Sequence, residues 1–407
     1  MSPSVPTTHP LLPYGEQEAL LVLEDGTVAR GRAYGARGRT LGELVFTTGM
    51  TGYQETLTDA ARAGQIVLMT APHVGNVGLN GEDPQAKRIW ARGLVVRDPA
   101  RRASSWRADT ELADELQAQD VVGIAEVDTR ALTRHLRGHG AMRAGIFSGP
   151  HLPAVPGRQG LADLVEQVRA AAPAAAMDLS QVTTPAAHTI EPDGGFDPPV
   201  GTVAVVDLGS ARMTARHLTE RGVRVRVLPA GTGAEDLLDA KPAGVLFTDG
   251  PGDPGAADQA VEVLRAVLTA RVPFFGVGLG HQLLGRALGL ATYKLKVGHH
   301  GLNHPVRDLR TGRVHITAHG HGFAVAEPSG QGATGTRGDG RFGGVRVSHV
   351  SLTDGVVEGL ECADVPAFSV QFHPAAAAGP RDAADLFDRF VAMIATDAVA
   401  PAAGEEV

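Results

Sequence analysis

Residues 273–282 read Pro-Phe-Phe-Gly-Val-Gly-Leu-Gly-His-Gln, and this stretch decides the fold. Its apolar start predicts a buried strand, and its glycines predict a tight turn at Gly278 followed by a helix over residues 281–288. A sharp strand-to-helix turn exposes one side chain beside a helix N-terminus, where negative charge is favoured, so this geometry suits a nucleophile. The glycine at this turn offers no nucleophile, acid or base.

The sequence around this stretch alternates between strand and helix patterns. Short apolar runs predict strands at 203–207, 223–228, 244–247 and 273–277. Helical spacing predicts helices at 211–221, 234–240, 256–269 and 281–288. Such alternation is typical of an α/β fold with a doubly wound parallel sheet, in which ligand sites form at the carboxyl ends of the strands.

The first half of the chain has a different pattern of predicted strands and helices. Strand-like runs with glycine-rich turns recur at 19–23, 44–46, 66–69 and 93–96, and helical patterns occur at 110–119, 128–136 and 161–171. Residues 182–200 are rich in Thr, Pro, Gly and Asp, a composition that rarely forms a regular element. We therefore expect a β-rich N-terminal domain over 18–180, a linker over 181–200 and the α/β domain over 201–395.

Composition narrows the class of protein. Hydrophobic residues make up 43% and charged residues 20% of the 407 residues, as in globular proteins, and the net charge is −8. Because no basic patch dominates, neither nucleic acid nor a membrane surface is an expected partner. The start MSPSVPTTHP does not resemble a secretory signal, and no apolar run approaches the ~18 residues that span a bilayer. Cys362 is the single cysteine, which excludes an internal disulfide, and the expected compartment is the cytoplasm.

Three motifs of the second half resemble the class I (triad) glutamine amidotransferases. Residues 276–282 match the family's G-x-C-x-G-H-Q at every fixed position except the cysteine, which is Gly278 here. Residues 249–254 (DGPGDP) resemble the G-P-G-D-P loop, whose backbone helps to form the oxyanion hole. Residues 368–374 (FSVQFHP) match the strand that carries the catalytic histidine, and the family's orienting glutamate falls at Ala375. Of the triad Cys-His-Glu, the resemblance implies that only His373 remains.

Motifs of the first half narrow the resemblance to the carbamoyl-phosphate synthase small chain. They are FTTGMTGYQE at 46–55, PHVGNVG at 72–78 and DTRALT at 128–133, in a domain that other triad amidotransferases lack. Further matches near 293–305 and 347–352 extend the resemblance over residues 18–395. The implied fold is a β-rich small-subunit domain followed by a doubly wound class I glutamine amidotransferase domain.

The resemblance also assigns a glutamine pocket. It implies substrate contacts from Gly49, Gly250, Gly252, Leu279, Gln282, Gly320, Gly322 and Phe323. The family's loop A-Q-N-H-G-F reads AHGHGF at 318–323, so the substrate-contacting Asn has become Gly320. The Asn that usually precedes G-P-G-D-P is Asp249, which brings a carboxylate to a site built for a neutral amide.

The family's activity gives three hypotheses for this chain. In the family, the small chain hydrolyses glutamine and passes ammonia to a large chain, which uses bicarbonate and two ATP to make carbamoyl phosphate for arginine and pyrimidine synthesis. The resemblance therefore implies a large-subunit partner that carries ATP and Mg, no cofactor in this chain, and L-glutamine that is bound but not hydrolysed. The chain is then a subunit for ammonia-dependent synthesis, a non-catalytic binding or regulatory protein, or an ordinary glutaminase subunit.

The sequence also contains residues that could serve as a displaced cysteine nucleophile or as a metal site. Cys362 lies in a polar segment without a strand-to-helix turn, which favours a structural cysteine over a displaced nucleophile. Five histidines also lie close in sequence: His299, His300, His315, His319 and His321. The last three would share one face of an extended strand, an arrangement that suits a metal. Because related small chains carry some of these histidines without a metal, we expect no metal site here.

Overall fold

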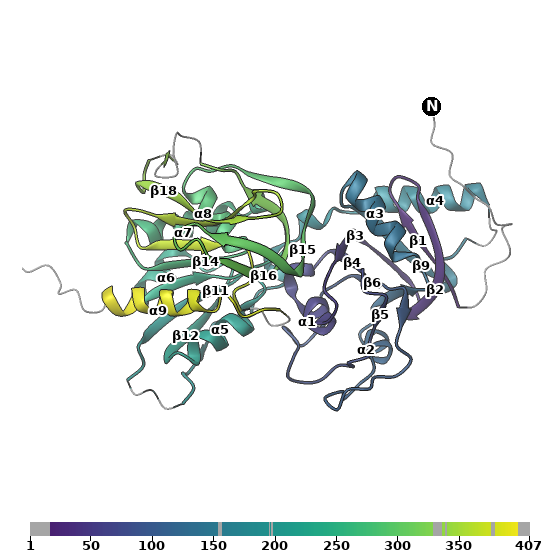
Figure 1. The fold of residues 1–407 in the computed structure, drawn as a ribbon, viewed down its shortest axis with the longest axis horizontal. Coiled ribbons are helices and arrows are strands. Elements are labelled where there is room, and N and C mark those ends of the chain that lie inside the picture. Colours follow the sequence, from purple (N-terminus) through teal and green to yellow (C-terminus); the bar gives the residue numbers. More distant parts are fainter. Residues whose placement is uncertain are drawn as a thin grey trace, which may run out of the picture. The chain divides into compact units, whose positions relative to one another are not determined.

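The structure is a computed structural model, which describes residues 17–153, 157–194, 196, 198–328, 336–337, 340–375 and 379–397. The chain forms two compact units, Met1–Ala176 and Met177–Val407 (Figure 1). The start of the chain, where no secretory signal is expected, lies outside the described residues. Within the stretch expected as a linker, β10 (His188–Ile190) pairs antiparallel with β12 (Val223–Pro229) of the second unit, so part of that stretch is a strand.

A closed barrel forms the centre of the first unit. Its strands follow the order β1-β2-β8-β6-β4-β3-β9, and closure leaves no exposed strand edge. Apolar side chains such as Leu21, Leu44 and Ile66 fill the interior and are fully buried. The barrel strands are β1 Glu18–Leu23, β2 Val28–Gly35, β3 Arg39–Thr47, β4 Gln65–Met69, β6 Gly93–Val95, β8 Val122–Ala125 and β9 Met142–Ser148.

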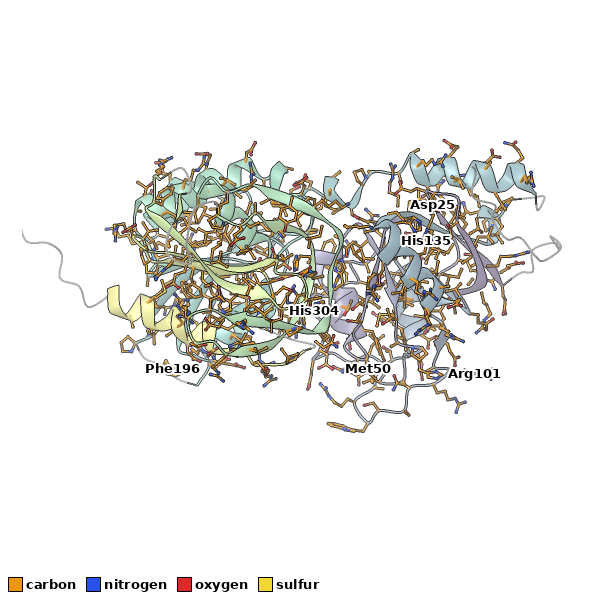
Figure 2. All side chains as sticks on the ribbon, turned by 45° about the horizontal axis from the view of Figure 1, so that its top comes forward. Asp25, Met50, Arg101, His135, Phe196 and His304 are labelled. Carbon is orange, nitrogen blue, oxygen red and sulfur yellow. The ribbon has the colours of Figure 1, made fainter. Side chains whose placement is uncertain are left out.

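Short helices and loops surround the barrel. The side chain of Asp128 caps α3 by accepting a hydrogen bond from the backbone N–H of Ala131. His135 of α3 contacts Asp25, which follows β1, with 2.6 Å between Nε2 and Oδ2 (Figure 2). The elements around the barrel are α1 Tyr53–Thr58, η1 Ala60–Arg62, β5 His73–Val74, β7 Asp98–Pro99, α2 Leu112–Ala118, α3 Thr129–His139, η2 Gly149–His151, α4 Arg158–Arg169 and η3 Ala174–Ala176.

The second unit is built on an 11-stranded sheet in the order β10-β12-β11-β13-β14-β20-β19-β16-β15-β18-β17. The run from β12 to β20 is parallel, and the remaining pairings are antiparallel. Its further strands are β11 Gly201–Asp207, β13 Gly244–Phe247, β14 Phe274–Val277, β15 Thr292–Asp308, β16 Val314–Val325, β17 Thr336–Arg337, β18 Gly344–Ser351, β19 Val357–Cys362 and β20 Ala367–Val370.

Helices cover both faces of the parallel part. Val203 and Val205 of β11 face the cluster that contains residues of α5 and α9, whereas Ala204 and Val206 face the cluster that contains residues of α6, α7 and α8. This alternation is the period of two that a strand buried on both faces requires. The helices are η4 Leu179–Gln181, α5 Ala211–Thr219, α6 Ala234–Asp239, η5 Pro254–Ala256, α7 Asp258–Thr269, α8 Leu279–Ala287 and α9 Asp385–Asp397.

The expected fold class is confirmed: a β-rich N-terminal unit precedes a doubly wound α/β unit. The strands β13, β14 and β20 are neighbours in the parallel run, so the loops that follow them meet at one edge of the sheet. Those loops carry Asp249, Gly278 and His373. Among the described residues, no helix combines the length and the apolar character needed to cross a membrane.

Candidate functional site

The strand-to-helix turn after β14 has the backbone of a nucleophile elbow. Gly278 has φ 56° and ψ −110°, a conformation that is strained for any residue with a Cβ. Its N–H donates to the carbonyl of Val370 at 2.9 Å, and its carbonyl accepts from His281 and Gln282 of α8 at 3.1 and 3.2 Å. The turn is therefore held by β20 on one side and by the first turn of α8 on the other.

The space beside the turn is occupied by the carboxylate of Asp249. A Cβ placed on Gly278 would overlap the Oδ1 and Cγ atoms of Asp249. Asp249 lies in the loop after β13 and is 5% exposed, so its side chain is enclosed rather than free to swing into solvent. A side chain at position 278 would require the carboxylate to move.

The same carboxylate fills a cradle of backbone donors. Asp249 Oδ1 accepts hydrogen bonds from the N–H of Leu279 at 2.7 Å and from the N–H of Gly250 at 2.8 Å. Two backbone N–H groups that converge on one oxygen at these distances have the geometry of an oxyanion hole. The helix N-terminus adds a favourable field for a negative oxygen. The carboxylate oxygen thus sits where an oxyanion would develop.

His373 lies on the other side of Asp249. Its Nε2 is 3.0 Å from Asp249 Oδ2, and its backbone N–H donates to Ala318 of β16 at 2.9 Å. Ala375, at the position expected for the orienting glutamate, packs instead against the apolar cluster of α5 and α9. Its carbonyl accepts a hydrogen bond from His217 Nε2 at 3.2 Å. Asp249 is therefore a carboxylate partner of His373.

The expected glutamine-pocket residues of the second unit come from the same region. Gln282 is 4% exposed, and its Nε2 donates to the carbonyl of Phe323 at 3.1 Å and to Gln371 Oε1 at 3.0 Å. Gly320 is buried in β16, and Gly322 follows it on the same strand. The structure therefore brings Gln282, from α8, against the strand that carries Gly320, Gly322 and Phe323.

Other expected residues fall on the adjoining loop or in the other unit. Gly250 donates to Asp249 as described, and Gly252 has φ 100°, a value that favours glycine. Gly49 belongs to the first unit, where it follows β3 and its N–H lies 3.4 Å from Thr47 Oγ1.

Cys362 lies in β19, outside this region, with its side chain buried. Burial raises the pKa of its thiol to about 12, with further contributions from Glu361 and Asp364. A thiol with such a pKa is almost entirely protonated at neutral pH, and the thiolate is the nucleophilic form. The interpretation of Cys362 as a structural residue therefore agrees with its surroundings.

Histidines that are close in sequence divide between two environments. His315 Nδ1 contacts the backbone carbonyl of Asp382 at 2.8 Å, whereas His319 and His321 converge with His299 and Glu358 in the interior. Burial lowers the pKa of both His319 and His321 well below the ordinary value, so these rings are neutral at pH 7. Among the described residues, this is a group of side chains that could hold a metal ion.

Sequence reasoning did not anticipate two of these residues. The change from Asn to Asp at position 249 was visible, but nothing in the sequence showed that its carboxylate reaches both Leu279 and His373. Glu358 is distant in sequence from the histidines that it contacts, and no motif singled it out. As arranged, the described residues of the site offer an imidazole–carboxylate pair and a filled donor cradle, and a glycine stands at the turn where a nucleophile was expected.

Comparisons with known proteins match both units. Residues 21–146 match the family model described as "Carbamoyl-phosphate synthase small chain, CPSase domain", and residues 204–393 match "Glutamine amidotransferase class-I". A carbamoyl phosphate synthase small chain of Streptomyces avermitilis is 55% identical over 381 residues, which cover 92% of this chain and 96% of the relative. The small chains of Bifidobacterium longum (strain NCC 2705) and Mycobacterium tuberculosis (strain H37Rv) are each 51% identical, covering 94% and 93% of this chain and 95% and 98% of the relatives.

Proposed function

Because the chain belongs to the family of carbamoyl-phosphate synthase small chains, we propose that it binds a large synthase chain and supports carbamoyl phosphate formation from ammonia rather than from glutamine. In this proposal the large chain carries ATP and Mg, and the product serves arginine and pyrimidine synthesis. The present chain contributes its shape and its binding surface, and its own glutaminase step is lost.

The observation that carries this proposal is the position of the Asp249 carboxylate. In the glutaminase reaction a thiolate attacks the amide carbonyl, and backbone N–H groups hold the oxyanion that results. Here the residue at the nucleophile position is Gly278, and Asp249 Oδ1 takes up the hydrogen bonds of Leu279 and Gly250. In this proposal the glutaminase reaction therefore lacks both its nucleophile and a free oxyanion hole at the turn after β14.

The expected loss of glutaminase rate can be judged from comparable catalytic triads, in which removal of the nucleophile alone lowers the rate on the order of 10⁶-fold. A filled cradle adds to this loss, because a negative carboxylate opposes a second negative oxygen at the same two N–H groups. The His373–Asp249 pair does not compensate, since an imidazole without a nucleophile to activate cannot start the thioester route.

Reconstitution of the complex tests the proposal. The full chain is co-expressed with the large synthase chain of the same organism, purified by size exclusion, and assayed for carbamoyl phosphate with ammonium or with L-glutamine as nitrogen donor. We expect a stable complex that works with ammonium and shows no glutamine-dependent turnover above that of the large chain alone. Glutamine-driven turnover comparable to that with ammonium would overturn the proposal. Failure of the two chains to co-purify would favour a binding or regulatory protein instead.

A rescue series separates the lost residues from the rest of the pocket. The variant Gly278→Cys/Ala375→Glu places the family's Cys and Glu at the triad positions but keeps Asp249. The triple variant with Asp249→Asn also removes the negative charge beside the N–H groups of Leu279 and Gly250. We expect glutamine hydrolysis only in the triple variant, because only there can the carbonyl oxygen of glutamine compete for Leu279 and Gly250. Equal glutaminase activity in both variants would show that the Asp249 carboxylate does not block the site.

A further inference from the structure

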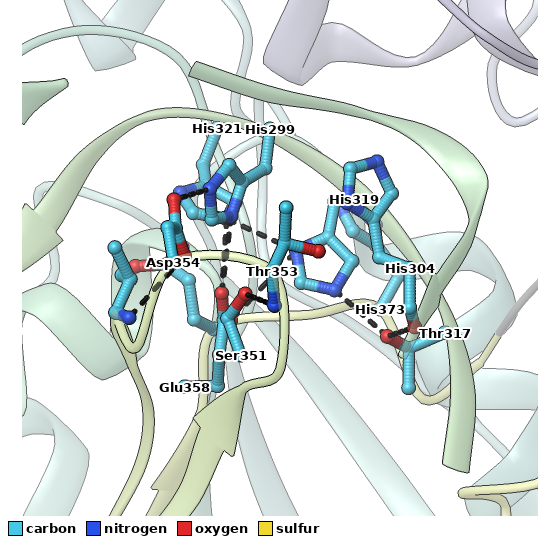
Figure 3. Close-up of polar contacts among 12 residues, drawn as sticks. His299, His304, Thr317, His319, His321, Ser351, Thr353, Asp354, Glu358 and His373 are labelled. Atoms are coloured by element: carbon cyan, nitrogen blue, oxygen red, sulfur yellow. Dashed lines mark hydrogen bonds and ion pairs between the residues drawn. The ribbon is translucent and has the colours of Figure 1, made fainter. Parts of the chain in front are cut away.

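Four buried side chains from three strands converge in the interior of the second unit. They are His299 of β15, His319 and His321 of β16, and Glu358 of β19, and Figure 3 shows them facing one another. One ring nitrogen or carboxylate oxygen from each residue lies within 4.8 Å of all the others. None of the four takes part in the glutaminase chemistry considered above.

The outer hydrogen bonds of the histidines fix which nitrogen carries the proton. His321 Nδ1 lies 2.8 Å from the carbonyl of Phe323, which can only accept. His299 Nε2 lies 2.7 Å from a carboxylate oxygen of Asp354. His321 Nδ1 is therefore a donor, and in this neutral ring Nε2 presents its lone pair toward the centre of the group. Burial opposes the charged form of His299, but hydrogen bonds to Glu358 and Asp354 raise its pKa, so without an ion its Nδ1 donates to Glu358.

His319 is fixed by a relay through a hydroxyl. Thr317 Oγ1 donates its hydrogen to the carbonyl of His304 at 2.9 Å, so it accepts from His319 Nε2 at 2.7 Å. The proton of the neutral His319 ring is then on Nε2, and Nδ1 presents its lone pair inward. Each histidine thus has an outer partner that orients it, which is the arrangement that metal-binding histidines show.

The inner atoms form an arrangement that favours a positive centre. His319 Nδ1 is 3.1 Å from His321 Nε2, although in these tautomers neither has a proton to share. Glu358 Oε1 is 3.1 Å from His299 Nδ1 and 3.9 Å from His321 Nε2, and Oε2 is 3.7 Å from His319 Nδ1. Glu358 is fully buried, and its Oε2 accepts no hydrogen bond within the described part of the chain. Burial raises the pKa of Glu358 to about 7, which reflects the cost of a negative charge here. A cation among the four residues would compensate both this carboxylate and the facing lone pairs of His319 and His321.

We propose that His299, His319, His321 and Glu358 bind one zinc ion in a closed, four-coordinate site. Zinc bonds to imidazole nitrogen and carboxylate oxygen are about 2.0–2.2 Å long, which places neighbouring ligand atoms of a tetrahedron about 3.3–3.6 Å apart. The separations of 3.1, 3.1, 3.7 and 3.9 Å among the ring nitrogens and the two Glu358 oxygens lie on both sides of that value. Imidazole ligands favour zinc over magnesium or calcium, which prefer oxygen.

The ion would act on structure, because all four positions are taken by protein side chains and no position remains for a substrate or a reactive water. It would join β15, β16 and β19, and β16 also holds the backbone of His373 through Ala318. This inference departs from the sequence expectation of no metal. The decisive residue is His319, which stands where the family's loop has Gln.

Metal content of the full chain, expressed without an affinity tag, tests the site. We expect roughly one zinc per chain by elemental analysis after dialysis. Apoprotein prepared with a chelator should regain about 3 °C or more in Tm with zinc, and cobalt should give the intense visible absorption of a tetrahedral ion. Substoichiometric zinc without a Tm shift, or the weak spectrum of octahedral cobalt, would overturn the proposal and leave a network of shared protons as the explanation.

Variants assign the ion to these residues. His319→Gln and Glu358→Gln should lose the zinc, and Asp354→Asn, which removes only the charge of an outer partner, should weaken zinc affinity by about 10- to 100-fold. The matched control is His188→Gln, which changes an exposed histidine of β10 and should retain the metal. Circular dichroism confirms folding of each variant. Full zinc content in a folded His319→Gln protein would refute the assignment, and the measurement on the unaltered chain decides the matter if the variants fail to fold.

Discussion

Asp249 Oδ2 lies 3.0 Å from His373 Nε2, while Oδ1 of the same carboxylate binds the N–H groups of Leu279 and Gly250. The Asp249 side chain therefore fills the space beside Gly278 and accepts both backbone N–H groups of the expected oxyanion hole. It also pairs with the imidazole of His373. Asp249 is buried and His373 is partly exposed, so removing His373 leaves a buried carboxylate that only the two backbone N–H groups compensate. The turn at Gly278 and the imidazole of His373 are therefore joined through the one carboxylate of Asp249.

The first prediction concerns the coupling between positions 278 and 249. Gly278→Cys should lower Tm, since a Cβ at φ 56° is strained by about 1–3 kcal/mol and would also overlap the Asp249 carboxylate. In an Asp249→Ala background the carboxylate is gone and only the Cβ of residue 249, 2.7 Å from the new Cβ, still adds crowding to the backbone strain, so the same substitution should cost less. We expect the two changes to be non-additive by about 1 kcal/mol or more, measured as Tm shifts in a double-mutant cycle.

A matched control separates strain from crowding. Gly312 has φ 74°, and a Cβ there would meet nothing within 4 Å. Gly312→Cys should therefore cost strain alone, and its effect should be the same with or without Asp249. If Gly278→Cys and Asp249→Ala prove additive within a few tenths of a kcal/mol, the carboxylate does not occupy the space beside Gly278.

The second prediction uses the single native cysteine. Burial raises the pKa of Cys362 to about 12, so its thiol should not react with a disulfide reagent at pH 8 in the folded protein and should react fully in denaturant. In Gly278→Cys/Asp249→Ala the new thiol lies at a helix N-terminus, which favours the thiolate, and one thiol should react in the folded state. Labelling of Cys362 in the native chain would contradict the first part.

Sequence reasoning reached some parts of this molecule and missed others for physical reasons. The helices α5 to α8 and the parallel strands were predictable because apolar residues repeat at the periods of helix and strand. The long strands β15 and β16 were not predicted, because histidines and glycines interrupt the apolar pattern and β15 carries register shifts between Lys294 and His299 and between Gly301 and His304.

In the candidate site, too, some features could be predicted from the sequence and others could not. The positions of Gly278, His373 and Ala375 could be read from motifs, because each motif is local in sequence. The hydrogen bonds of Asp249 depend on how β13, β14 and β20 lie side by side, and the contact between His299 and Glu358 joins residues 59 positions apart. Such contacts are set by tertiary packing, so no local pattern could indicate them.

The third prediction concerns pH. His281 is fully buried in α8, and burial, with a smaller contribution from His349, lowers its pKa to about 3. In the unfolded chain the pKa is about 6.5, so below that pH the unfolded state binds a proton that the folded state refuses. Stability is therefore fully present above pH 6.5 and is lost as the pH falls toward 3, by up to about 1.4 kcal/mol per pH unit from this residue.

A variant isolates this contribution. His281 Nδ1 contacts Ser369 Oγ at 2.9 Å, and His281→Asn keeps an amide that can bond this hydroxyl but cannot be protonated. We expect the decrease in Tm between about pH 7 and about pH 5 to be smaller in His281→Asn than in the native chain. An unchanged pH dependence would mean that His281 does not contribute, and that other buried histidines such as His349 account for the loss.

The last prediction tests the close packing of strand and helix at the turn. A Cβ on Gly276 would lie 2.6 Å from the carbonyl oxygen of Gly280, which is backbone and cannot rotate away. Gly276→Ala should therefore push β14 from the first turn of α8 and cost about 1–3 kcal/mol, seen as a lower Tm. Gly322→Ala is the matched control, because a Cβ there meets nothing within 4 Å and should leave Tm nearly unchanged. Equal Tm values for the two variants would show that α8 can shift without cost, and the oxyanion cradle formed by Leu279 would then be less rigid than its hydrogen bonds imply.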